Sequence, residues 1–335
     1  MSTRPNIVLL ATGGTIAGTI DPDGRSYTAG VLSPDALLAQ APGVATFANL
    51  QCESCLALDS KDMDAADWMH IAHTTRELLA RASVDGVVIA HGTDTLEETA
   101  QFLELTFDSD KPVVLTGAMR PADAISADGP ANLYDAIRVA ADAESRGRGV
   151  LVCMNEAIFA GGTVRKNHAH RVDAFTSRNG SLGHARPAVR FHTPGSRPRS
   201  YMNLPPQANV LPVVETLHVG AGSSPALAEA AVRHGRARGL VLALPGNGSV
   251  PKSWESTISR LIEDGITIVR ASRCAESFIG PTTIDERLHT WPAGRLSAAQ
   301  ARVTLILALA TGNADADRFL SAAGLTSDSG LVQSW

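Results

Sequence analysis

The sequence predicts an α/β protein of two domains, with a doubly wound, mostly parallel sheet in the N-terminal domain and a smaller C-terminal α/β domain. Three observations indicate this. Short apolar runs alternate with helical patterns, a proline-rich stretch interrupts them, and the alternation then resumes on a smaller scale. The chain has 335 residues, 44% of them hydrophobic, which is enough for two such cores.

In the first half, continuous apolar runs are typical of buried parallel strands, and longer periodic segments between them are typical of helices. The strands are expected at residues 7–11, 86–90, 113–116 and 149–154, and the helices at 65–81, 96–107 and 130–143. This region, residues 1–190, is the predicted N-terminal domain.

Residues 191–212 have the composition of a linker, because prolines recur there among Arg, Ser and Gly. The predicted C-terminal domain covers residues 213–335. Its strands are expected at 213–218, 240–244 and 266–270, and its helices at 225–234, 252–262 and 298–310.

Charge and hydropathy exclude two classes of partner. The formal net charge is −5 and no basic block stands out, so nucleic acid is not an expected partner. The longest apolar stretches, such as Val303 to Ala310, are too short to span a membrane. A strand is expected from Asn6 with no apolar stretch before it, which favours a cytoplasmic protein or an exported one whose signal has been removed.

The cysteines and histidines favour structural roles. Cys52 and Cys55 form a C-x-x-C pair in an extended run, where residues three apart point to opposite faces, so we interpret them as structural rather than redox-active. Cys153 and Cys274 stand alone, and the histidine pairs lack neighbouring carboxylates or cysteines. The sequence therefore predicts no bound metal.

A glycine-rich loop follows the first strand. Read from Gly13, it is G-G-T-I-A-G, which departs from the dinucleotide fingerprint at Thr15 and lacks the lysine of a phosphate-binding loop. We therefore expect no nucleotide cofactor. A tight turn is the simpler interpretation of Gly13 and Gly14.

Threonines beside glycines follow three predicted strands, at residues 12–15, 91–95 and 116–117. Ligands of open α/β sheets bind beyond the carboxyl ends of the strands, so these hydroxyls should share one crevice. The segment from Thr95 to Glu98 has the pattern of a capping box, which predicts a helix start at Thr95. Thr93 and Asp94 would then precede a helix N-terminus, which favours negative charge. Asp94 as a simple cap remains an alternative.

Together these segments resemble the bacterial-type L-asparaginase/glutaminase family. The resemblance rests on residues 11–17, 91–100, 111–121, 126–133, 245–248 and 272–273, and it spans nearly the whole chain. It implies two α/β domains. It also implies active sites between the subunits of an intimate dimer, which usually pairs into a tetramer.

The resemblance also implies roles for individual residues. Thr15 matches the family's primary nucleophile, and Tyr27 lies on a mobile flap close to it. Thr93, Asp94 and Lys166 match a second catalytic group. Substrate-binding positions are matched by Ser60, Thr93, Asp94, Asn247 and Ser249, with Glu286, preferred to Glu276, as the glutamate that a partner subunit supplies.

The chemistry explains these residue types. A threonine hydroxyl is a poor nucleophile until a neighbour withdraws its proton, and a tyrosine can relay that proton. A lysine held beside an aspartate and screened from water can tune such a network.

Two positions depart from the family pattern. Lys61 follows Ser60 where periplasmic-type members usually carry Gln, so Lys61 either contacts the substrate carboxylate or points to solvent. Ser249 stands where asparagine-selective members often have Asn, which makes glutaminase activity an expectation.

The predicted function is hydrolysis of L-asparagine to L-aspartate and ammonia, with no metal or organic cofactor. A glutaminase-asparaginase and a non-catalytic amino-acid-binding protein are alternatives. A subunit of an archaeal-type tRNA amidotransferase would need a further N-terminal domain before the strand expected at Asn6.

Overall fold

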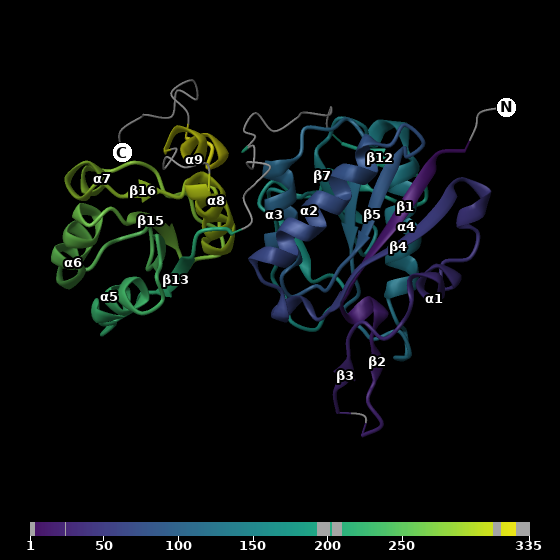
Figure 1. Ribbon diagram of the computed structural model, residues 1–335, viewed down its shortest axis with the longest axis horizontal. Coiled ribbons are helices and arrows are strands. Elements are labelled where there is room, and N and C mark those ends of the chain that lie inside the picture. The colour runs from purple at the N-terminus through teal and green to yellow at the C-terminus, as the bar shows by residue number, and fades with distance from the viewer. Residues whose placement is uncertain (1–3, 24, 193–201, 203–209, 311–315, 326–335) are drawn as a thin grey trace. The chain divides into compact units, whose positions relative to one another are not determined.

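The computed structural model describes residues 4–23, 25–192, 202, 210–310 and 316–325. It confirms the predicted fold class: a mostly parallel sheet with helices, followed by a smaller α/β unit (Figure 1). The chain divides into a first unit, Met1–Pro198, and a second unit, Arg199–Trp335. The predicted linker, residues 191–212, falls mostly outside the described residues.

The first unit contains an eight-stranded sheet of order β12-β11-β8-β7-β6-β5-β1-β4. The five strands from β4 to β7 in this order are parallel, and β8, β11 and β12 are added antiparallel. The strands are β1 (Asn6–Gly13), β4 (Asn49–Leu58), β5 (Gly86–Ala90), β6 (Val113–Thr116), β7 (Val150–Met154), β8 (Ala157–Ala160), β11 (Gly183–His184) and β12 (Arg190–Phe191).

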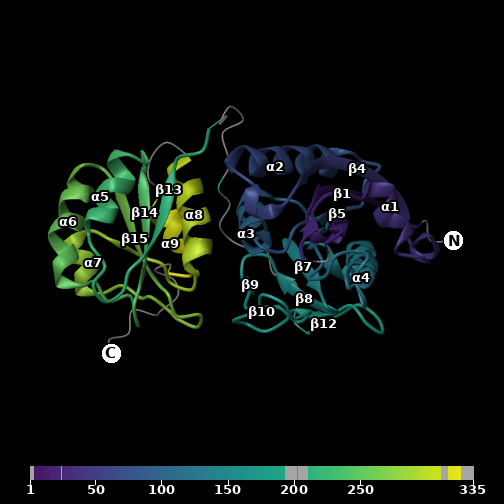
Figure 2. The ribbon, with the colours of Figure 1, turned by 90° about the horizontal axis from the view of Figure 1, so that it is seen from below.

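Helices cover both faces of this sheet (Figure 2). Leu37 of α1 (Pro34–Ala39) and Ile137 of α4 (Gly129–Ala141) join one core cluster with alternate residues of β1, β5 and β7. On the opposite face, α2 (Ala65–Ala80) and α3 (Leu96–Thr106) pack together through stacked Trp68 and Phe102 rings, 5.5 Å apart. The strands are continuously apolar because both faces are buried.

The strand order reverses beside β1. After β1 the chain forms β4 on one side of it, and it then crosses to form β5 on the other side. A doubly wound sheet has its crevice at such a switch point, beyond the carboxyl ends of the two strands. The loops that follow β1 and β5 therefore border this crevice.

Short elements were not predicted from the sequence. A hairpin of β2 (Thr19–Ile20) and β3 (Tyr27–Thr28) follows β1, and β9 (Val164–Lys166) pairs with β10 (Phe175–Ser177). Strands of two or three residues are too short for alternation to be recognised. The remaining short elements of the first unit are the 3₁₀ helices η1 (Thr15–Ala17), η2 (Val44–Thr46), η3 (Ser60–Asp62) and η4 (Ala143–Ser145).

The second unit is a four-stranded parallel sheet of order β13-β14-β15-β16 with helices around it. Its strands are β13 (Val214–His218), β14 (Gly239–Leu244), β15 (Thr267–Ser272) and β16 (Trp291–Pro292). Its helices are α5 (Ala226–Arg233), α6 (Lys252–Glu263), α7 (Thr283–Leu288), α8 (Ala298–Ala310) and α9 (Ala316–Ala322).

The two cysteines of the C-x-x-C pair lie on opposite faces of β4, as predicted. Cys52 packs against the cluster that includes α1, whereas the Cys55 sulfur lies 3.9 Å from the hydroxyl of Thr74 on α2. Burial raises the pKa of both thiols, which disfavours a reactive thiolate. Among the helices that the structure describes, none has the length and apolar character needed to cross a membrane.

Candidate active site

Glycines let the loops after β1 and β5 meet backbone to backbone. Gly14 has a φ of 78°, which favours glycine, and a Cβ there would lie 2.3 Å from the Cα of Gly92. A Cβ on Gly92 would in turn lie 2.6 Å from the Ser60 hydroxyl. The loops after β1 and β5 are therefore in contact at Gly14 and Gly92. Thr15 directly follows Gly14 and Thr93 directly follows Gly92, so the two threonines adjoin this contact.

Thr15 begins η1 and is only 7% exposed. Its Oγ1 lies 2.9 Å from the hydroxyl of Tyr27 in a hydrogen bond. The predicted pairing of these two hydroxyls is therefore present in the structure, and a proton on Thr15 has a direct acceptor.

The β2–β3 hairpin presents Tyr27, which is 37% exposed. Within the hairpin, Asp21 accepts hydrogen bonds from the hydroxyls of Ser26 (2.6 Å) and Thr28 (2.8 Å), and these bonds lower the pKa of its carboxyl. The backbone N–H of Ile20 donates to both carboxylate oxygens of Asp123, at 2.9 and 3.1 Å. Asp123 was not singled out from the sequence, because only the fold brings it beside the hairpin.

Thr93 and Asp94 follow β5 and meet Lys166 at the end of β9. The Lys166 ammonium donates to Thr93 Oγ1 at 2.9 Å and to Asp94 Oδ1 at 2.6 Å. Thr93 is 4% exposed, and the side chains of Lys166 and Asp94 are 14% and 53% exposed. Residues 72 and 73 positions apart in sequence are thus assembled as the resemblance implies.

The helix start that follows differs from the predicted capping box. Helix α3 begins at Leu96, but the Thr95 side chain makes no cap hydrogen bond. Its hydroxyl instead donates to the backbone oxygen of Ser60 at 2.9 Å, while the Thr95 N–H lies 3.4 Å from Ser60 Oγ. The prediction of a capping box was wrong because a contact with a distant loop competes for the threonine hydroxyl. Ser60, 1% exposed, is thereby fixed against Gly92 and Thr95, the residues that flank Thr93 and Asp94.

Lys61 lies on the surface next to Ser60. Its ammonium bonds Asp62 at 2.8 Å and Asp59 at 3.0 Å, and 59% of its side chain is exposed. These two carboxylates, Asp62 foremost, raise the pKa of Lys61. Of the two alternatives, this geometry favours the one in which Lys61 points to solvent.

Behind Thr93, His91 is buried and neutral. Trp68 Nε1–H donates to the Thr99 hydroxyl (3.1 Å), which lies 3.0 Å from His91 Nε2, and His91 Nδ1 lies 2.7 Å from the Gly92 oxygen. A carbonyl can only accept, so we assign the proton to Nδ1. Burial lowers the pKa of His91 to about 4. The sequence showed His91 in the motif but gave no sign of this supporting role.

In the second unit, Asn247 and Ser249 lie in the loop after β14, and Glu286 lies on α7; all three are exposed. A buried arginine joins their two segments. Arg270 pairs bidentately with Asp285 and donates to the Gly248 oxygen at 2.9 Å. These predicted residues belong to a different unit from Thr15, and their part in a site stays a prediction.

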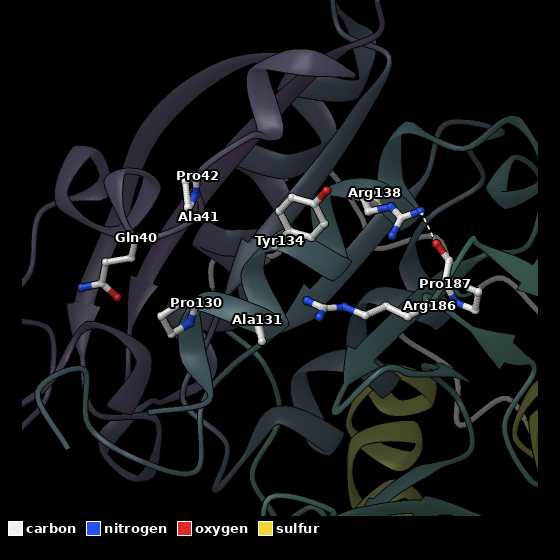
Figure 3. Close-up of a pocket in the computed structure, with 9 residues that line it drawn as sticks. All are labelled: Gln40, Ala41, Pro42, Pro130, Ala131, Tyr134, Arg138, Arg186 and Pro187. Carbon is white, nitrogen blue, oxygen red and sulfur yellow. Dashed lines mark hydrogen bonds between the residues drawn. The ribbon is translucent and has the colours of Figure 1, made fainter. Parts of the chain in front are cut away.

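A cavity of about 650 Å³ lies along α4, and Figure 3 shows its lining. It is lined by Gln40, Ala41, Pro42, Pro130, Ala131, Tyr134, Arg138, Arg186 and Pro187. Both arginines are engaged: Arg186 bonds the buried Asp135 at 2.7 Å, and Arg138 donates to the Pro187 oxygen at 3.0 Å. The lining includes none of the predicted site residues, so the candidate site is the threonine crevice.

No group of three or more His, Cys, Asp or Glu side chains able to hold a metal occurs among the described residues. The crevice holds two buried hydroxyls, each bonded to a proton-carrying side chain, beside an exposed carboxylate. Such a set suits covalent attack on an activated carbonyl.

Comparison with known proteins identifies related chains along almost the whole length. The family model "Asparaginase, N-terminal" matches residues 6–196, and the model "Glutaminase/Asparaginase C-terminal domain" matches residues 213–319. L-asparaginase 2 of Escherichia coli is 39% identical over 320 residues, covering 91% of this chain and 89% of that protein. The glutaminase-asparaginase of Acinetobacter glutaminasificans is 36% identical over 324 residues, covering 92% of this chain and 96% of that protein.

A solved structure is also similar. The crystal structure of a probable cytoplasmic L-asparaginase from Campylobacter jejuni aligns with a TM-score of 0.90 and 36% identity, covering 96% of this chain and all of that one. Both family models, the relatives and the solved structure agree along nearly the whole length, so this chain belongs to the asparaginase/glutaminase family.

Proposed function

We propose that the protein hydrolyses the side-chain amide of L-asparagine to L-aspartate and ammonia, with Thr15 as the nucleophile. The observation that carries the proposal is the pair of buried threonine hydroxyls at the switch point, bonded to Tyr27 and to Lys166. A protein that only binds amino acids needs no such second activated hydroxyl.

The reaction proceeds in two balanced steps. Thr15 Oγ1 attacks the amide carbon while its proton passes to the Tyr27 oxygen and Tyr27 gives its own hydroxyl proton to the amide nitrogen, so the tyrosine stays neutral; the C–N bond then breaks, and the nitrogen leaves as ammonia. Water next hydrolyses the resulting threonine ester and restores the hydroxyl. Lys166, bonded to Thr93 and Asp94, holds the second hydroxyl in a fixed orientation and supplies positive charge near the developing oxyanion.

Substrate is held by the polar groups around the crevice. The half-exposed carboxylate of Asp94 suits the α-ammonium group of an amino acid, and Ser60 suits the α-carboxylate. From the second unit we propose Asn247 and Ser249 as further contacts and Glu286 as the residue from a partner subunit. The working assembly is then a homodimer or homotetramer, which size-exclusion chromatography with light scattering tests.

L-glutamine is proposed as a second substrate. Ser249 supports this, as does the similarity to a relative named glutaminase-asparaginase. We also propose a cytoplasmic location, with export after signal removal as the alternative; the similar Campylobacter jejuni protein is named cytoplasmic and a Haemophilus influenzae relative periplasmic.

Ammonia release from L-asparagine, L-glutamine and D-asparagine by the purified full chain tests the proposal. We expect turnover of L-asparagine, slower turnover of L-glutamine, and no change on addition of EDTA. Binding of L-asparagine without ammonia release would instead support a binding protein. Loss of activity with EDTA and its rescue by zinc would overturn the metal-free mechanism.

A further inference from the structure

Glu97 contacts the backbone of Lys166, and no sequence motif indicated this contact. Glu97 lies in the first turn of α3, and its Oε2 accepts the Lys166 N–H at 2.7 Å. The same short segment also supplies Thr93 and Asp94, which hold the Lys166 ammonium. Residues 93–97 thus accept hydrogen bonds from both the backbone N–H and the side-chain ammonium of Lys166.

The strand that carries Lys166 belongs to a sheet of two short strands. β9 is three residues long and pairs with β10, with Phe175 opposite Lys166. The next N–H, that of Asn167, donates to Ala174 across this pair at 2.8 Å. Alternate N–H groups of a strand point to opposite edges, so the Lys166 N–H points away from β10, toward Glu97.

We propose that Glu97 is a positioning residue that fixes Lys166 against Thr93 and Asp94; this inference rests on the proposed function of the crevice. The carboxylate docks the end of β9 onto the first turn of α3, and Figure 2 shows these two elements as neighbours. Without an acceptor at residue 97, the Lys166 N–H turns to water and the strand end shifts. A shift of about 1 Å in a catalytic group can lower turnover about 100-fold.

The same helix provides a matched control. Glu104, two turns further along α3, accepts the N–H of Val150 at 2.7 Å. Glu104 is buried and Glu97 half-buried, and each carboxylate accepts an N–H at the start or end of a neighbouring strand. Val150 begins β7 and is not part of the proposed site. Substitution of Glu104 therefore reports the cost of losing such a bond without displacing Lys166.

The test measures kcat and KM for L-asparagine, the pH profile of kcat, and the melting temperature in the full chain. Glu97→Ala and Glu97→Met both remove the acceptor, so loss of one variant to misfolding leaves the other. We expect either to lower kcat at least about 30-fold with KM within about threefold, and to move the pH profile. Glu97→Gln keeps an acceptor and should restore kcat to within about fivefold of wild type.

Glu104→Ala and Glu104→Met should lower the melting temperature by a similar amount while kcat stays within about twofold. In a Lys166→Met background, Glu97→Met should change kcat by less than about twofold, because the group it positions is gone. Equal kcat losses from the Glu97 and Glu104 variants, or no rescue by Glu97→Gln, would overturn the inference alone. A wild-type chain that releases no ammonia would overturn the proposed function, and the inference with it.

Discussion

The two halves of the crevice hold their hydroxyls in different ways. Thr15 depends on Tyr27, which a hairpin of two-residue strands presents at the surface. Thr93 depends on Lys166, which is 14% exposed and bonded by three residues of one segment. The difference teaches that the partner of the proposed nucleophile lies on a partly exposed hairpin, whereas the partner of the second hydroxyl is mostly buried and held by several hydrogen bonds.

The largest effect is a loss of kcat that we expect to be similar for the two threonines. Thr15→Ala and Thr93→Val should each lower kcat by on the order of 10³-fold or more, because each removes one of the two hydroxyls. Ammonia release at saturating L-asparagine measures it. Thr106→Val on α3 is the control, since among the described residues that hydroxyl bonds the backbone oxygens of Phe102 and Leu103 in its own helix. A folded Thr15→Ala protein with near-normal turnover would contradict the assignment of Thr15 as the nucleophile.

The buried half should also show a pH dependence of stability. His91 has a pKa of about 4 in the folded protein against 6.5 when unfolded. Its contribution to the free energy of unfolding is therefore complete above pH 6.5 and is lost as the pH falls toward 4. Burial raises the pKa of Glu104 to about 7 from 4.5, so its contribution is complete below pH 4.5 and is lost as the pH rises toward 7. The two slopes oppose each other in the wild type.

Glu104→Gln removes one of these slopes. As the pH rises from about 5 to about 6.5, the variant's free energy of unfolding, measured with urea, should increase by about 2 kcal/mol. Over the same range the wild type should change by less than about 1 kcal/mol. Identical pH profiles for the two proteins would contradict the assignment of a buried Glu104 that stays protonated over this range.

The hairpin half should respond to loss of its outer tether. Asp123→Ala removes the acceptor of the Ile20 N–H and should lower kcat/KM about 3- to 10-fold, since Tyr27 then spends less time on Thr15. Asp23→Ala, which removes the acceptor of the Arg25 N–H within the same hairpin, is the control. If both variants behave alike, the tether to Asp123 has no part in placing Tyr27.

The smallest effect is expected at Lys61. Because its ammonium already bonds Asp59 and Asp62 at the surface, Lys61→Gln and Lys61→Met should leave KM within about threefold and kcat unchanged. KM and kcat measured at low and high salt decide this. A salt-sensitive rise in KM in both variants would instead place the lysine on the substrate carboxylate.

Much of the fold could be predicted because its signals are local. The strands at 86–90 and 113–116 have the bounds that their apolar runs indicated, and α8 begins and ends where its pattern did. Contacts between distant segments could not be predicted. Thr95 bonds Ser60 rather than its own helix, and Glu97 reaches a strand 69 residues away. The family resemblance supplied Lys166, whose local sequence is that of a surface lysine.

The contact between Gly14 and Gly92 bears on how substrate range can be altered in the laboratory. A Cβ at either position would collide with backbone or with the Ser60 side chain, at 2.3 and 2.6 Å. The distance between the two loops at this contact is therefore set by the van der Waals radii of backbone atoms and not by the rotamers of side chains. Directed evolution toward larger amides should find its gains on the surrounding walls, while libraries at these two glycines yield mainly misfolded protein.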